Sequence, residues 1–135
     1  MTQRTLVLLK PDAVRRGLVG DVLSRFEAKG LSIVAMEFRQ IDGALADRHY
    51  AEHIERDFYP PLREFVTSGP MISMVLEGDE AVEVVRAING ATDGRKAAPG
   101  TIRGDLSLSN RENLVHGSDS LESAEREIGI WFPQL

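Results

Sequence analysis

The chain contains three histidines, and His116 stands in the setting best suited to nucleophilic chemistry. It ends a short apolar segment, and Gly117 and the polar residues that open a predicted helix follow it. A strand would fix the imidazole ring, glycine would leave backbone room, and helix N–H groups would attract an anion. Neutral imidazole is nucleophilic near neutral pH. The pattern indicates a histidine nucleophile, and a structural histidine at a strand end is the alternative.

A second group of candidate residues lies in and beside the long polar segment 89–113. Arg86 precedes this segment, and Thr92 and Arg103 lie within it. An arginine binds two phosphate oxygens at once, and a threonine hydroxyl adds a donor. Loops of this length are unusual inside a compact domain and tend to be functional. These residues could therefore bind an anion, and a solvated surface loop is the alternative.

The segment His49-Tyr50-Ala51-Glu52-His53 matches H-x-x-E-H, the inverted zinc-peptidase motif. Two histidines four residues apart on a helix could share a zinc ion, with Glu52 as the base. A third ligand and a substrate cleft would also be needed. Zinc-dependent peptide hydrolysis is thus the second functional hypothesis.

Aromatic residues cluster around Pro60-Pro61. Phe58 and Tyr59 precede the two prolines, and Tyr50 lies shortly before them. An aromatic ring at the edge of a cleft can stack on a nucleobase without reading its identity. Ordinary packing is the alternative interpretation.

The composition excludes several classes of protein. Lysine and arginine total 16 and aspartate and glutamate total 21, which gives a formal net charge of −5. A protein that grips a nucleic-acid backbone is usually basic, so nucleic acid is not expected as a main partner, and any anionic ligand needs a local group of cations. The absence of cysteine excludes disulfides and thiolate catalysis. No apolar run approaches the ~18 residues of a membrane span. We expect a cytoplasmic protein.

Four apolar segments predict strands at residues 5–9, 31–38, 71–76 and 114–116. Helices are predicted at 18–29, 44–53, 62–66, 81–88 and 119–128. Gly30 is expected to end the first of these helices, and Asp79 to cap the helix at 81–88. Asp119 and Glu122 are expected to form a capping box at the start of the last helix. Pro11 is expected to stop the first strand. The core order is βαββαβ, the ferredoxin-like α+β arrangement. It predicts a four-stranded antiparallel sheet with helices on one face, in a single domain spanning 1–135.

Taken together, these segments resemble the nucleoside diphosphate kinase family over nearly the whole chain. The resemblance runs from Arg4-Thr-Leu-Val-Leu-Leu-Lys-Pro-Asp12 to Glu127-Ile-Gly-Ile-Trp-Phe132. Its most specific segment is Asn113-Leu-Val-His-Gly-Ser-Asp-Ser120. Pro99-Gly-Thr-Ile-Arg-Gly-Asp105 and His49-Tyr50 support it.

The resemblance implies a ping-pong phosphotransfer that requires Mg²⁺ and maintains NTP and dNTP pools. A nucleoside triphosphate, mainly ATP, would give its γ-phosphoryl group to Nδ1 of His116, and an NDP or dNDP of any base would then accept it. Ser118 and Glu127 would orient the ring, and Asp119 would help to place the metal through water.

The resemblance also assigns the remaining site residues and the assembly. Lys10 and Asn113 would hold ribose hydroxyls and the bridging oxygen, and Tyr50 would line the site near His116. Contacts to the phosphates would come from Arg86, Thr92 and Arg103, and contacts to the base from Phe58 and Leu62. The family implies a homo-oligomer built from dimers, either a hexamer or a tetramer, with no membrane partner. On this interpretation the zinc motif is a coincidence.

Two positions depart from the family pattern. Gly94 stands where the family usually has proline, and glycine there is expected to loosen the loop. Asn110 stands where an apolar residue near the base is common. A nucleotide-binding module without turnover is a third hypothesis, and the intact set of site residues argues against it.

Overall fold

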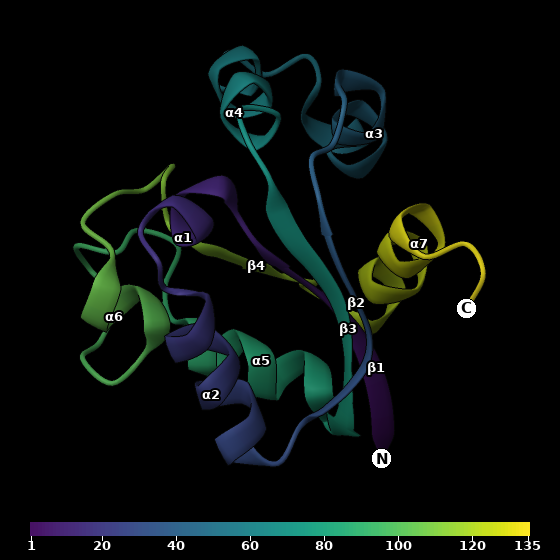
Figure 1. The fold of residues 1–135 in the computed structure, drawn as a ribbon. Helices are drawn as coiled ribbons and strands as arrows, with labels where there is room; N and C mark the ends of the chain where they lie inside the picture. Colours follow the sequence, from purple (N-terminus) through teal and green to yellow (C-terminus); the bar gives the residue numbers. More distant parts are fainter.

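The computed structural model describes residues 1–135 and contains one four-stranded antiparallel sheet (Figure 1). The strands lie in the spatial order β2-β3-β1-β4. Their bounds are β1 Thr2–Leu9, β2 Ser32–Arg39, β3 Met71–Asp79 and β4 Val115–Gly117. The expected ferredoxin-like α+β sheet is confirmed, with all four strands in the predicted order along the chain.

The helices connect and cover these strands (Figure 1). Their bounds are α1 Pro11–Arg15, α2 Val19–Lys29, α3 Gly43–His49, the 3₁₀ helix η1 Ala51–His53, α4 Tyr59–Val66, α5 Ala81–Asn89, α6 Ile102–Leu106 and α7 Leu121–Trp131. None of them combines the length and the apolar character that a bilayer crossing would require.

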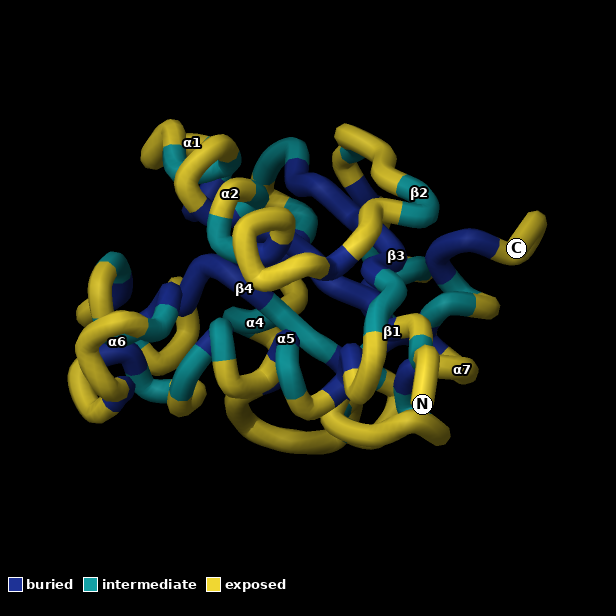
Figure 2. Tube along the Cα trace, turned by 90° about the horizontal axis from the view of Figure 1, so that it is seen from below, coloured by how far each residue is buried: buried dark blue, intermediate teal, exposed yellow.

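Both faces of the sheet are covered by helices. Val7 and Leu9 of β1 point into a core with Phe26 of α2 and residues of α5. Leu6 and Leu8 point to the opposite face, where they meet α3, α4 and α7. The central strands are accordingly buried, whereas β2 is largely exposed (Figure 2). The prediction that helices lie on one face is therefore wrong. The unbroken apolar run of β1 is typical of a strand buried on both sides.

Several predicted helix ends also differ from the structure. The first strand ends at Leu9, before Pro11, as predicted, but Pro11 also begins the unpredicted helix α1, because its fixed φ suits the first turn of a helix. Asp79 is paired with the N-terminal ammonium, and Glu80 precedes α5. Ser120, not Asp119, caps α7 by accepting a hydrogen bond from the Ser123 N–H at 3.0 Å. Other ends agree.

Gly30, for example, ends α2 as predicted, in the left-handed conformation with φ 102°. Such a conformation favours glycine because it has no Cβ to clash with the backbone.

The long loop after α5 is held in place by hydrogen bonds within the loop. It contains α6, which was not predicted, and whose first turn is capped by the Thr101 hydroxyl. The Gly94 N–H donates to the Ser109 carbonyl at 3.1 Å, and a Cβ at residue 94 would lie only 2.3 Å from the Ser107 carbonyl oxygen. Gly94 is therefore packed against backbone, and a proline there would also lose the N–H donor.

Replacing Gly94 with alanine should lower the free energy of unfolding by about 1–3 kcal/mol, because a Cβ would overpack the loop. The matched control is Gly20→Ala, at an exposed position of α2 where a Cβ would meet nothing within 4 Å. That change should raise stability by about 0.5–1 kcal/mol through helix propensity. Urea unfolding of both variants checks the opposite signs, and a stabilised Gly94→Ala would contradict the packing argument.

Candidate active site

A cleft of about 840 Å³ opens between the α3–α4 segment and the loop that contains α6. Residues distant in sequence meet here because β1 and β4 are neighbours in the sheet and Leu8 pairs with His116. Ser118 is fully buried behind the cleft. The other eleven residues predicted for the site all line it: Lys10, Tyr50, Phe58, Leu62, Arg86, Thr92, Arg103, Asn113, His116, Asp119 and Glu127.

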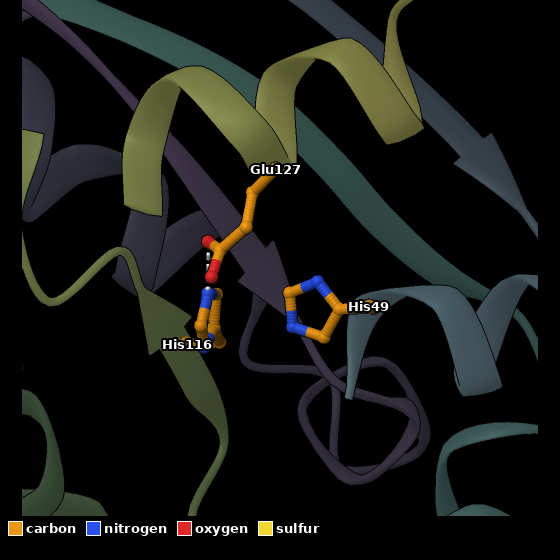
Figure 3. A group of neighbouring side chains, drawn as sticks. All are labelled: His49, His116 and Glu127. Atoms are coloured by element: carbon orange, nitrogen blue, oxygen red, sulfur yellow. Dashed lines mark hydrogen bonds and ion pairs between the residues drawn. The ribbon is translucent and has the colours of Figure 1, made fainter. Parts of the chain in front are cut away.

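His116 is held by a hydrogen-bonded chain that crosses three elements. Its Nε2 lies 2.8 Å from Oε1 of Glu127 on α7 (Figure 3). The Ser118 hydroxyl donates to the same oxygen at 2.8 Å and accepts from the Leu6 N–H at 3.2 Å. A carboxylate can only accept, so Nε2 carries the proton and Nδ1 keeps its lone pair. The free nitrogen is the one that could act as a nucleophile.

His49 is the residue of this site whose role the sequence did not suggest. It is buried, and its ring meets that of His116 edge to face, with 4.7 Å between the centroids (Figure 3). The Trp131 indole N–H donates to Nδ1 of His49 at 3.0 Å. Burial lowers the pKa of His49 well below 6.5, and the neighbouring His116 and Arg126 add to this effect. His49 is thus neutral, with its proton on Nε2.

The structure overturns the zinc-peptidase hypothesis. Helix α3 ends at His49, so His49 and His53 do not share one continuous helix. The group whose ligand atoms lie within 4.8 Å of one another is instead His49, His116 and Glu127. In that group Nδ1 of His49 already accepts from Trp131, and His116 is bonded to Glu127. Glu52 and His53 contribute nothing to it, so the five-residue match is a coincidence.

Lys10 places a buried cation beside the histidines. Its Nζ donates to Oδ1 of Asn113 at 2.8 Å, and the Asn113 amide donates to the Thr92 and Asn110 carbonyls, each at 2.9 Å. Burial, together with the Arg103 cation, lowers the pKa of Lys10 to about 8, and Asp12 opposes the shift. Desolvation of an ammonium is unfavourable, so this site is suited to an anionic ligand.

Arg103 ties the loop to β4. Its guanidinium donates to the carbonyls of Asn113, Gly90 and Val115 at 3.2, 2.9 and 2.6 Å. Burial, together with the Arg86 cation, lowers the pKa of Arg103 to about 10. The side chain of Arg86, by contrast, is exposed and forms no hydrogen bond or ion pair within the chain. One arginine thus shapes the site, and the other is available to a ligand.

The mouth of the cleft is apolar on one side and acidic on another. Phe58 is 47% exposed, and Leu62 lies half-buried close to it in sequence. Asn110 also lines the cleft. Asp119 stands at the start of α7, and a hydrogen bond with the Ser123 side chain lowers its pKa, with Arg86 and His116 adding to the shift. Asp119 is therefore a carboxylate at neutral pH, able to hold a hard cation.

Comparison with known proteins gives a consistent result. The family model described as nucleoside diphosphate kinase matches residues 3–135. A protein of Nocardioides sp. named nucleoside diphosphate kinase is 78% identical over the full length of both chains. One of Cutibacterium acnes with the same name is 62% identical over 98% of this chain and 96% of its own. A halophilic nucleoside diphosphate kinase from Halobacterium salinarum, solved in complex with CDP, is 49% identical with a TM-score of 0.95, covering 98% of this chain and 88% of its own.

His49 should remain neutral as the pH falls from about 8 to 5, the range in which an ordinary histidine titrates. Nitrogen-15 NMR of the imidazole should show Nδ1 unprotonated and Nε2 protonated throughout. The urea-unfolded protein is the control, because its histidines should titrate near 6.5. Since the unfolded state takes up this proton and the folded state does not, His49 should reduce stability as the pH falls below about 6.5. A charged His49 in the folded protein at pH 6 would contradict the assignment.

Proposed function

Since the chain belongs to the nucleoside diphosphate kinase family, enzymes that transfer phosphate between nucleoside triphosphates and diphosphates, we propose that it works through a phosphohistidine on His116. In the first half-reaction Nδ1 attacks the γ-phosphorus of a triphosphate, mainly ATP. The bond from that phosphorus to the bridging oxygen breaks, and the diphosphate leaves. In the second half-reaction an oxygen of another diphosphate takes the phosphoryl group from Nδ1. The two steps constitute a ping-pong mechanism.

The observation that carries this proposal is the Glu127–His116 hydrogen bond of 2.8 Å. It fixes the proton on Nε2 and leaves Nδ1 free toward the cleft. The imidazole gains positive charge when Nδ1 bonds to phosphorus, and the Glu127 carboxylate stabilises that charge. Ser118 holds the carboxylate in place from the other side. Phosphoryl transfer needs little more from a protein than in-line positioning and charge stabilisation.

The cations of the cleft supply the charge stabilisation. The guanidinium of Arg86 has no partner in the chain, and we assign it to phosphate oxygens together with the Thr92 hydroxyl. Arg103 uses three N–H groups on carbonyls, which leaves the remaining guanidinium donors for a phosphate. Lys10 and Asn113 are already joined by a hydrogen bond, and we place the ribose hydroxyls and the bridging oxygen on this pair. The Tyr50 hydroxyl lines the same region near His116.

The residues present fit a magnesium ion. Mg²⁺ keeps several waters and is usually held by one or two carboxylates together with substrate phosphates. Asp119 is the ionised carboxylate at this end of the cleft, and it would hold the metal through water. Bound there, Mg²⁺ would neutralise charge on the phosphates.

Broad base and sugar tolerance fits the apolar mouth of the cleft. Stacking of a base on Phe58, with Leu62 beside it, involves no hydrogen bond to a base edge. The complex of the similar Halobacterium enzyme with CDP supports nucleotide binding by this fold. Acceptance of all NDPs and dNDPs would allow a single cytoplasmic enzyme to maintain NTP and dNTP pools. We infer that residues 1–135 form one such domain, since the family model spans 3–135.

We also propose a homo-oligomer built from dimers, either a hexamer or a tetramer. Strand β2 is at an edge of the sheet, so one side of its backbone is unpaired. Ile33, Met36 and Phe38 on it are 37, 48 and 65% exposed. An apolar edge strand of this kind is suited to pairing with a second copy of the chain. Leu108 of the long loop, 86% exposed, offers a second apolar contact for a higher assembly.

The mechanism is tested by incubating the protein with Mg²⁺ and γ-labelled ATP and quenching in alkali. The wild type should carry a base-stable, acid-labile label that GDP discharges as GTP. His116→Gln should carry no label, because the nucleophile is gone. Ser24→Ala, on the exposed side of α2, is the matched control that keeps the label. A folded, ATP-binding wild type without label would instead favour a nucleotide-binding module.

The dimer proposal is tested by the molar mass in solution. Phe38→Asp should shift the assembly toward smaller species in light scattering, because a charge would be buried at the edge of β2. Ile54→Asp, an exposed apolar residue away from the strands, is the control that keeps the wild-type mass. If Phe38→Asp keeps the wild-type mass as well, β2 is not the interface.

A further inference from the structure

Leu114 adopts a backbone conformation that leucine rarely occupies. Its φ is 75°, in the left-handed region, although its side chain is fully buried in the core with Val7 and Phe26. A bulky residue in this region is a genuine outlier and persists only where its surroundings hold it. Leu114 lies between Asn113 and the strand that carries His116. Whatever holds Leu114 therefore affects the geometry of the site.

Both backbone groups of Leu114 bind the same corner of the chain. Its N–H donates to Oδ2 of Asp12 at 3.1 Å, and its carbonyl accepts from the Lys10 N–H at 2.8 Å. Lys10 and Asp12 stand on either side of Pro11, where β1 ends and α1 begins. The two bonds form a clamp between segments that are about a hundred residues apart in sequence.

The burial of Asp12 at this position is unfavourable for the free energy of folding. It is 3% exposed, and its Oδ1 has no hydrogen-bond partner. Burial raises its pKa, and the Lys10 cation and the Leu114 N–H oppose the shift. Burial of a carboxylate that is only partly hydrogen-bonded costs folding free energy, so its presence here suggests a specific task. The proposed phosphoryl transfer assigns no such task to Asp12, which does not line the cleft.

The clamp acts on the residues that do line the cleft. Lys10 donates its N–H to Leu114 and its Nζ to Asn113, so it is bonded both to Leu114 and to the residue before it. His116 follows Leu114 by two residues and pairs with Leu8 of β1. A change at Leu114 would therefore move Asn113 and His116 relative to Lys10.

We propose that Asp12 is a positioning residue for the phosphoryl transfer, which holds the left-handed turn at Leu114 and thereby sets Lys10, Asn113 and His116 relative to one another. This inference rests on the proposed function. Asp12 acts through the backbone and touches no reacting atom. A displacement of about 1 Å at a catalytic group can cost on the order of 10²-fold in rate.

Two conservative variants separate the position of the acceptor from its charge. Asp12→Asn keeps an oxygen where Leu114 needs an acceptor but removes the charge. Asp12→Glu keeps the charge but displaces the acceptor by one methylene. We measure the single-turnover rate of His116 labelling at saturating γ-labelled ATP, the KM for ATP, and urea unfolding. Val22→Ala, a buried change on α2, is the matched control for lost stability.

Asp12→Asn should label within about 3-fold of the wild-type rate, whereas Asp12→Glu should label about 10- to 100-fold more slowly. Val22→Ala should lose stability and keep its rate. A slow Asp12→Asn beside a normal Asp12→Glu would overturn the proposal in favour of a charge effect. So would an Asp12→Glu variant that loses stability but keeps the wild-type rate, as Val22→Ala does. An unlabelled wild type would instead defeat the proposed function itself.

Discussion

The site depends on one hydrogen-bonded chain, which runs from the Leu6 N–H through Ser118 and Glu127 to Nε2 of His116. Its members come from three parts of the fold: Leu6 from β1, His116 and Ser118 from β4 and the residue after it, and Glu127 from α7. The chain forms because β1 and β4 are adjacent and because α7 covers the second face of the sheet. The covering of both faces of the central strands is therefore also what brings a carboxylate to the histidine. The contacts that pack α7 and β4 against β1 are therefore also the contacts that form the site.

The positive charge of the site comes from a local cluster of cations and not from the net charge of the protein. The protein has a net charge of −5, yet Lys10, Arg86 and Arg103 meet in a single cleft. Burial lowers the pKa values of Lys10 and Arg103 to about 8 and about 10, because desolvation penalises each cation. Arg103 offsets part of this penalty with three backbone carbonyls. An anionic ligand would relieve the rest, so the same desolvation that destabilises the empty cleft favours a bound phosphate.

The hydrogen bonds around His116 also set the tautomers of the two neighbouring histidines. Trp131 fixes the proton of His49 on Nε2, and Glu127 fixes that of His116 on its own Nε2. Two imidazoles in edge-to-face contact thus have defined and different partners. Together with the strained Leu114, these contacts restrict the orientation of the groups that face the cleft before any nucleotide arrives. Preorganisation of this kind reduces the cost of reorganisation during the reaction.

The amino-acid sequence by itself determined the four strands, the helix between Leu18 and Gly30, and the residues of the cleft, because periodicity and motifs are local properties. Some local patterns gave wrong predictions: Asp79 and Asp119 resemble helix caps, and the H-x-x-E-H pattern resembles a metal site. Only the tertiary structure decided that helices cover both faces, that Trp131 binds His49 across 82 positions, and that Asp12 holds Leu114. These features arise when distant segments pack together, and the hydrogen bonds and burial that create them have no signature in a local pattern.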